Sequence, residues 1–150
     1  IAVMPSNLYG PNDYFDSQKA HVLPALMYKF HEAKKNSTEV TLWGTGKARR
    51  EFLHVDDVAD ACLFLMNTYD RPEIINVGSG TDLSVKELAQ MIKKIIGSEG
   101  KINWDASKPD GTPQKLLDVT KLHALGWKHK VNLEEGIMQT YKWYKKNRDV

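Results

Sequence analysis

The sequence predicts a mixed α/β domain with small sheets. Three segments carry apolar residues at i, i+3, i+4 and i+7, which is the period of a helix with one buried face. The first five residues are apolar throughout, which is typical of a buried parallel strand. With 150 residues, the chain can form one domain with its own core. The helical sets are Leu23, Leu26, Met27 and Phe30; Val58, Ala61, Cys62 and Leu65; and Leu88, Met91, Ile92 and Ile95.

The N-terminal half is expected to alternate strands and helices. The run Ile1-Ala-Val-Met-Pro5 predicts a strand whose parallel neighbours would precede it in the sequence. After the first helix, Val40 and Leu42 alternate as in a strand, Gly44-Thr-Gly46 predicts a tight turn, and Arg49 to His54 predicts a returning extended segment. Asp56 and Asp57 are interpreted as cap and first-turn charges of the second helix.

The C-terminal half carries clear helix boundaries. Ser84 with Glu87 predicts a capping box, and Gly97 predicts the end of that helix. Asn132 with Glu135 repeats the start signal for a last helix. The remaining predictions are strands at 74–77 and 101–104, a Pro/Gly loop at 107–113, and a short helix at 120–125 that ends at Gly126.

Composition excludes several function classes. The net charge of +2 is too small for a nucleic-acid footprint, and the basic residues are scattered. No apolar run is long enough to span a bilayer, so no membrane partner and a cytoplasmic location are expected. The histidines show no ligand spacing, and no metal site is predicted. The single cysteine, Cys62, lies at an apolar helix position and is interpreted as a small buried hydrophobe.

Residues 40–57 form the densest group of ligand-binding residue types. Trp43, Arg49 and Arg50 lie around the glycine turn. A guanidinium can donate two hydrogen bonds to phosphate oxygens while an indole covers a base, so this group favours a nucleotide diphosphate. An ordinary hairpin with a half-buried tryptophan and solvated arginines explains the same pattern equally well.

Seven sequence motifs stand out along the chain: Asn7-Leu-Tyr-Gly-Pro11, His21-Val-Leu-Pro-Ala-Leu26, Trp43-Gly-Thr-Gly46, Arg50-Glu-Phe52, Val55-Asp-Asp57, Asn76-Val-Gly78 and Lys108-Pro-Asp-Gly-Thr-Pro113. Together they resemble the C-terminal half of the extended short-chain dehydrogenase/reductases, and within them the GDP-L-fucose synthases. The resemblance implies an α/β fold: a substrate-binding domain over residues 1–150, carrying the last strand or strands of a Rossmann sheet. Residues 1–12 would be the trailing strand and loop of an NADP-binding domain whose core is missing here. No Gly-x-Gly-x-x-Gly fingerprint is present.

What the resemblance implies is epimerisation of GDP-4-keto-6-deoxy-D-mannose at two carbons, followed by NADPH-dependent reduction to GDP-L-fucose. His21 would be the acid/base residue, and it would also meet the cofactor. Most histidines near the start of a helix have no catalytic role. A lysine on a helix face, such as Lys29, is usually just solvated. The implied cofactor contacts are Pro5, Ser6, Asn7, Leu8 and His21, and the implied substrate contacts are Lys29, Trp43, Arg50 and Asp110.

The resemblance leaves two further readings open. One is the substrate half of another nucleotide-sugar epimerase or 4,6-dehydratase, with preference for UDP- or dTDP-sugars. The other is a nucleotide-sugar binding module without chemistry. In the full-length enzyme most NADP contacts would come from the missing domain and the assembly would be a homodimer, so the isolated chain is predicted to be inactive. Apolar surface is expected around Ile1 to Met4.

Overall fold

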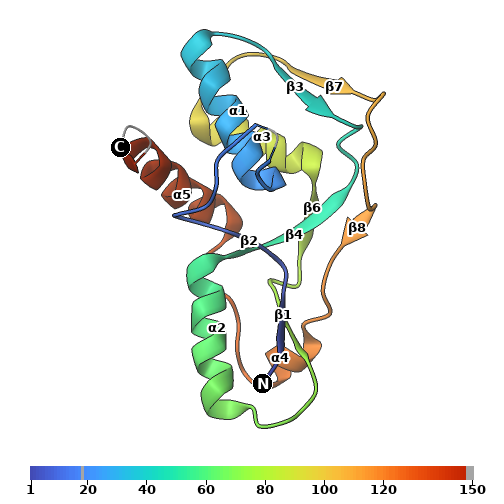
Figure 1. Cartoon of the computed structure of the whole chain (residues 1–150), viewed down its shortest axis with the longest axis vertical. Coiled ribbons are helices and arrows are strands. Elements are labelled where there is room, and N and C mark those ends of the chain that lie inside the picture. Colours follow the sequence, from blue (N-terminus) through green and yellow to red (C-terminus); the bar gives the residue numbers. More distant parts are fainter. Residues whose placement is uncertain (18, 148–150) are drawn as a thin grey trace.

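The computed structural model describes residues 1–17 and 19–147 and confirms the mixed α/β architecture (Figure 1). Helices and strands alternate along most of the chain, as expected for a doubly wound fold and its appended domain. The helices are α1 (Val22–Asn36), α2 (Val55–Thr68), α3 (Val85–Ile96), α4 (Thr120–Ala124) and α5 (Leu133–Asn147). The strands are β1 (Val3–Pro5), β2 (Asn7–Tyr9), β3 (Val40–Trp43), β4 (Arg49–His54), β5 (Ile75–Val77), β6 (Asp82–Ser84), β7 (Ile102–Asp105) and β8 (Gln114–Lys115).

Strand β4 is the hub of the sheet structure. Its C-terminal half pairs in parallel with β2, and its N-terminal half pairs antiparallel with β6 and parallel with β8. Two separate parallel pairs, β1 with β5 and β3 with β7, lie on either side of this four-stranded sheet. The predicted hairpin is therefore wrong: β3 and β4 are both strands, but β3 pairs with β7.

The apolar side chains form two cores, one on each side of β4 (Figure 1). The larger core lies among α1, α3, α5 and β3, with the fully buried Phe30 and Ile92 near its centre. The smaller core lies between α2, α4 and the β1–β5 pair, and Leu65, Ile75 and Leu122 are buried there. Residues along β4, Phe52 in one core and Leu53 in the other, join the two.

The helix boundaries follow local sequence signals closely. The Ser84–Glu87 capping box forms, and Gly97 ends α3 in the left-handed conformation. Before α5, Asn132 Oδ1 accepts the N–H of Glu135 at 2.9 Å, as predicted. Asp56 and Asp57 lie in the first turn of α2, as predicted, but neither caps the helix, because His54 is the N-cap residue and its Nδ1 accepts the N–H of Asp56.

Asp57 does more than start α2. Its carboxylate is 2% exposed and accepts the backbone N–H groups of Lys130 at 2.9 Å and Val131 at 3.0 Å. This pair of hydrogen bonds ties the segment before α5 to the start of α2. Cys62 also departs from expectation, because its side chain is half-buried where full burial was predicted.

The first strand is parallel as predicted, but its partner β5 follows it in the sequence, where a preceding neighbour was expected, and the strand is not fully buried. Val3 is half-buried, whereas Ile1 is 63% and Met4 49% exposed. The expected apolar surface at this end is confirmed, and Ile74 beside it is also exposed. None of the helices within the described ranges has the length and apolar content that a membrane-spanning helix requires.

Candidate functional site

The segment Pro5–Leu8 leaves the carboxyl end of β1, which is the edge where doubly wound sheets bind ligands. Ser6 donates its N–H to the carbonyl of Val77 at 3.0 Å, and Asn7 Nδ2 donates to the carbonyl of Glu51 at 2.7 Å. These contacts hold the backbone of the segment between β5 and β4. The Ser6 hydroxyl is buried and has no hydrogen-bond partner within the described residues. An orphaned hydroxyl at this edge is a candidate ligand contact.

His21 lies at the N-terminus of α1 and faces a cavity of about 530 Å³. Leu8 lines the same cavity, so the structure brings the predicted acid/base residue together with one end of the predicted cofactor segment. Asp13 and Asp56 supply the carboxylates of the lining. The imidazole is exposed and makes no capping hydrogen bond, which leaves its nitrogens open to a ligand.

Tyr9 is a buried aromatic residue that also lines the cavity at His21. Its ring is 2% exposed and meets the His54 ring edge-on at a centroid distance of 5.3 Å. Burial, reinforced by the charges of Asp57 and Glu135, raises the pKa of the Tyr9 phenol well above its usual range. The phenol therefore stays protonated, and Tyr9 acts here as a core aromatic.

Lys29 lies on α1 and lines a second cavity of about 280 Å³, in which Glu32 and Glu39 are the acidic residues. Its side chain is half-buried, and this burial lowers the pKa of the amine from its usual value. Desolvation disfavours the charged form of an amine. A solvated lysine has no such desolvation penalty. An anionic ligand bound at the Lys29 amine would offset it by favouring the charged form.

The two neighbouring arginines of β4 have different surroundings. Arg49 forms an ion pair with Asp82, with 2.8 Å between Nη2 and Oδ1, and its Nη1 lies 3.9 Å from Glu87. Among the described residues, Arg50 donates to two carbonyl oxygens, those of Arg49 and Thr112, both at 2.7 Å from Nη1. No carboxylate pairs with Arg50 within residues 1–17 and 19–147. Arg50 is thus an oriented guanidinium whose charge is available to an anion.

Asp110, a predicted substrate contact, lies on a loop that folds back over the glycine turn at Gly44 to Gly46. Asp110 Oδ1 accepts the N–H of Thr45 and Oδ2 accepts its hydroxyl, both at 2.6 Å. These bonds, the hydroxyl bond first, hold the pKa of the carboxyl below its usual range. An added side chain at Gly44 would collide with Asp110, so only glycine fits there. The carboxylate clamps the turn and keeps lone pairs for a further donor.

Trp43 is 65% exposed at the end of β3, next to this clamped turn. The alternative expectation of a half-buried tryptophan is therefore wrong. The amine of Lys108 lies over the Trp43 ring, 5.8 Å from the ring centroid, in a cation–π contact. An exposed indole beside a cation offers a flat apolar face for a base or sugar ring, in the way aromatic side chains serve at ligand sites.

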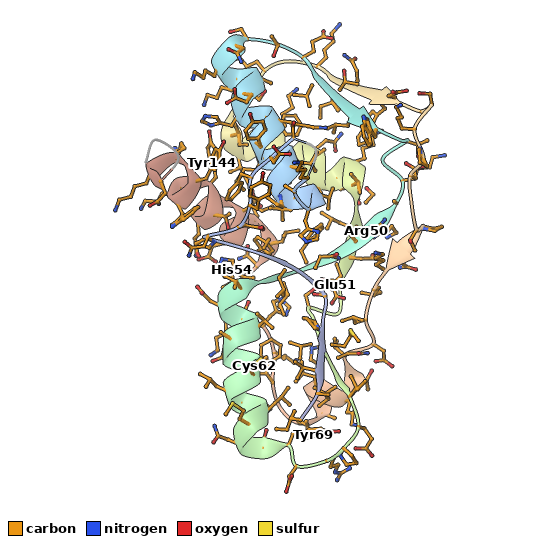
Figure 2. All side chains as sticks on the ribbon, in the orientation of Figure 1. Arg50, Glu51, His54, Cys62, Tyr69 and Tyr144 are labelled. Atoms are coloured by element: carbon orange, nitrogen blue, oxygen red, sulfur yellow. The ribbon has the colours of Figure 1, made fainter. Side chains whose placement is uncertain are left out.

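The sequence patterns predict no role for Glu51, yet its carboxylate connects several segments around the site. It is 1% exposed on β4, beside Arg50 (Figure 2). Its Oε1 accepts the N–H of Gly80 at 2.7 Å and its Oε2 accepts the N–H of Leu117 at 3.0 Å. The carboxylate therefore joins β4 to the turn after β5 and to the segment after β8. A side chain at Gly78 would collide with it, which explains the glycine.

Comparison with known proteins gives one family and a consistent group of relatives. The model of the family described as "NAD dependent epimerase/dehydratase family" matches residues 1–78. The chain is 57% identical to GDP-L-fucose synthase 1 of Arabidopsis thaliana over 148 residues, covering 98% of this chain and 46% of that protein. The chain thus spans about half the length of the curated relatives it matches.

Two solved structures show the same fold. A GDP-L-fucose synthetase from Naegleria fowleri bound to NADP superimposes with a TM-score of 0.93 at 33% identity, covering 99% of this chain and 47% of that one. A UDP-glucose 4-epimerase from Thermotoga maritima gives a TM-score of 0.81 at 31% identity, covering 97% and 46%. The arrangement is that of the C-terminal half of an extended short-chain dehydrogenase/reductase, as the sequence predicted.

Proposed function

Because the chain belongs to the NAD dependent epimerase/dehydratase family, we propose that it is the substrate-binding part of a GDP-L-fucose synthase. The observation that carries the proposal is the 57% identity to a curated protein of that name over 98% of this chain. Two features of the site support a nucleotide diphosphate as ligand: the unneutralised Arg50 and the half-buried amine of Lys29. The Trp43 indole would cover a ring of the ligand, and the Asp110 carboxylate would accept a hydrogen bond from a ribose hydroxyl or a base edge.

The proposed reaction has two stages at one site. GDP-4-keto-6-deoxy-D-mannose is epimerised at two carbons, and the 4-keto group is then reduced to give GDP-L-fucose. Protons on carbons beside a ketone are acidic only when the enolate oxygen is stabilised, and an acid must return a proton to the opposite face. A residue that titrates near neutrality suits this task, and His21 is that residue in the proposal.

The residues of the cofactor segment fit the nicotinamide end of NADP. The exposed backbone at the carboxyl end of β1 and the orphaned Ser6 hydroxyl offer polar contacts there. Pro5, Ser6, Asn7, Leu8 and His21 would hold this end, while the phosphates would bind outside this chain. When bound, NADPH supplies the hydride for the reduction. The chain itself contributes positioning and proton transfer.

The remaining parts of the proposal concern the whole enzyme. Residues 1–12 would belong structurally to the NADP-binding domain, and the exposed side chains of Ile1, Met4 and Ile74 would contact it. A homodimer and a cytoplasmic location complete the proposal. The chain alone is expected to leave NADPH unoxidised in the presence of the keto-sugar, because most of the cofactor site lies outside it.

Calorimetric titration of the chain with GDP and UDP tests the binding role. We expect saturable GDP binding that is tighter than UDP binding and that weakens at least tenfold in Arg50→Ala, since a charge-assisted pair to phosphate is lost. Arg49→Ala is the matched control, because this neighbouring guanidinium is already paired with Asp82. Equal weakening by both substitutions, or absence of GDP binding, would contradict a nucleotide site at Arg50.

A second candidate is the corresponding half of a UDP-sugar epimerase. The observation in its favour is the TM-score of 0.81 to the Thermotoga UDP-glucose 4-epimerase, which shows that the same scaffold serves a UDP-sugar enzyme. Stronger binding of UDP than of GDP in the same titration would decide for this candidate. Sequence identity favours the first, at 57% against 31%.

A further inference from the structure

Helix α2 has an apolar side that the described residues leave open to solvent. The side chains of Leu63 and Met66 are 64% and 72% exposed, and Val55 at the start of the helix is 37% exposed. Ala59 is exposed as well, and Cys62 is half-buried midway along the helix (Figure 2). These five residues recur three or four positions apart, so they lie on one side of the helix and form an apolar stripe, the α2 stripe.

The other two sides of α2 are occupied. Ala61 and Leu65 are buried in the smaller core beneath the helix. On a second side, Asp60 Oδ2 accepts the indole N–H of Trp127 and Oδ1 accepts from the amine of Lys130, both at 2.8 Å. This pair of bonds covers that side with the segment before α5. A helix whose apolar residues extend beyond its core face needs a second apolar neighbour, and the α2 stripe is where such a neighbour would pack.

The sheet beside α2 is open at β1. This strand pairs in parallel with β5, and its opposite edge has no partner strand within the described ranges. Val3 of β1 and Val58 of α2 pack against the same core, so strand and helix are neighbours (Figure 1). The open edge of a parallel sheet can receive one more parallel strand, and a parallel strand is joined to the next through a crossover that is usually a helix.

The handedness of such connections decides on which face that helix would lie. The chain passes from β1 to its partner β5 by way of α2, and connections between parallel strands are almost always right-handed. A strand at the open edge, then β1, then β5 would follow one another in the same direction across the sheet. A right-handed connection into β1 therefore places its helix on the face that α2 already covers, next to α2.

We propose that the α2 stripe binds an amphipathic helix from the half of the enzyme that precedes β1, namely the helix that leads into this strand. The chain covers 46% of the length of a curated relative and has the fold of the C-terminal half, so this helix would belong to the other half. The proposal rests on the proposed function only in that the chain is part of a longer enzyme. The contact between the halves would then extend from the end of β1 along the whole of α2.

The test joins the preceding half of Arabidopsis GDP-L-fucose synthase 1 to residue 1 of this chain and compares the joined protein with the 150-residue chain. Leu63→Glu should leave urea unfolding of the 150-residue chain nearly unchanged, because position 63 faces solvent there. In the joined protein the same substitution buries a charge against the new helix, and the urea midpoint should fall by about 1 M or more.

Met138→Glu is the matched control. Met138 is 49% exposed on α5, so its substitution should have little effect on either protein. Equal effects of Leu63→Glu in the two proteins, or equal effects of Leu63→Glu and Met138→Glu in the joined protein, would overturn the proposal. A joined protein that does not fold, although the 150-residue chain does, would also count against it, because the stripe would then not accept that half.

The single thiol gives a second readout that needs no substitution. Cys62 is half-buried within the α2 stripe, so iodoacetamide should alkylate it in the 150-residue chain. In the joined protein the new helix should cover it and slow alkylation roughly tenfold or more, as read from the mass of the peptide that contains Cys62. Equal rates in the two proteins would contradict the contact.

Titration with GDP separates this proposal from the proposed function. Leu63 lies on α2 and Arg50 on β4, so the 150-residue chain with Leu63→Glu should bind GDP as the unaltered chain does. Absence of GDP binding at Arg50 would refute the nucleotide site and leave the helix contact standing. Unchanged alkylation of Cys62 alongside GDP binding would refute the helix contact alone.

Discussion

Replacement of Glu51 by glutamine should destabilise the chain far more than its conservative character suggests. The carboxylate is 1% exposed, and its two oxygens accept the backbone N–H groups of Gly80 and Leu117 at 2.7 and 3.0 Å. Glutamine has one acceptor oxygen, so one of these N–H groups must face an NH₂ group. The partners come from different segments, and both are held to β4 by this one side chain.

The expected loss can be worked out from these two bonds. A buried N–H left without an acceptor costs about 1–3 kcal/mol. Conversion of the remaining bond from charge-assisted to neutral removes about 1 kcal/mol more. Glu51→Gln should therefore lower the free energy of unfolding by roughly 2–4 kcal/mol, a large share of the 5–15 kcal/mol typical of a domain.

Urea unfolding followed by circular dichroism measures this loss. Asp118→Asn is the control, because Asp118 also accepts a backbone N–H, that of Thr120, but from an exposed position where water can replace the lost acceptor. Its free energy of unfolding should stay close to that of the unaltered chain. If Glu51→Gln is no more destabilising than Asp118→Asn, the role assigned to the buried carboxylate is wrong.

Two more predictions concern carboxylates that tie loops to the site. Asp57→Asn should lower the free energy of unfolding by roughly 2 kcal/mol in urea unfolding, because one of the N–H groups of Lys130 and Val131 loses its acceptor. The pKa of Asp110 is depressed in the fold, so the stabilisation from its bonds to Thr45 is present above the ordinary carboxyl pKa and is lost as pH falls through the depressed value. In Thr45→Val, ¹³C titration should show this pKa move back toward its ordinary value, and no movement would contradict the clamp.

The parts of the fold that were predictable from sequence are those governed by local contacts. The capping box at Ser84 and Glu87 and the glycine that ends α3 use groups a few positions apart, and both form as expected. Strand pairing depends on distant partners. The turn at Gly44 to Gly46 suggests a hairpin, but β3 finds its partner in β7, beyond two helices.

The same distinction separates the predicted from the missed site residues. Charge and aromatic character drew attention to Trp43 and Arg50, and family resemblance to His21. The hydrogen bonds of Glu51 and Asp57 could not be predicted from the sequence, because the backbone donors are far away along the chain. Leu117 lies 66 positions from Glu51, and Lys130 lies 73 positions from Asp57. The sequence shows Glu51 only as a glutamate within a predicted strand, and the collision that a side chain at Gly78 would make with it becomes visible only in the fold.

Lys29 offers a further prediction that separates a ligand-binding amine from a solvated one. Burial is the cause that lowers its pKa, and no hydrogen bond or ion pair to it is found in the described part of the chain. The fold therefore disfavours the charged amine: the penalty is fully present below the lowered pKa and is lost as pH rises from the lowered pKa to the ordinary one. A bound phosphate would favour the charged form and raise the pKa again, so GDP binding should take up protons near that pH.

Consequently, the affinity for GDP should fall as pH rises through the lowered pKa of Lys29, and it should fall less in Lys29→Gln. The titration of GDP itself is common to both proteins, so the difference between their pH profiles reports the lysine alone. Calorimetry in two buffers of different ionisation enthalpy counts the protons directly. Identical proton uptake by the two proteins would place the Lys29 amine away from the phosphates and leave Arg50 as the cation that binds them.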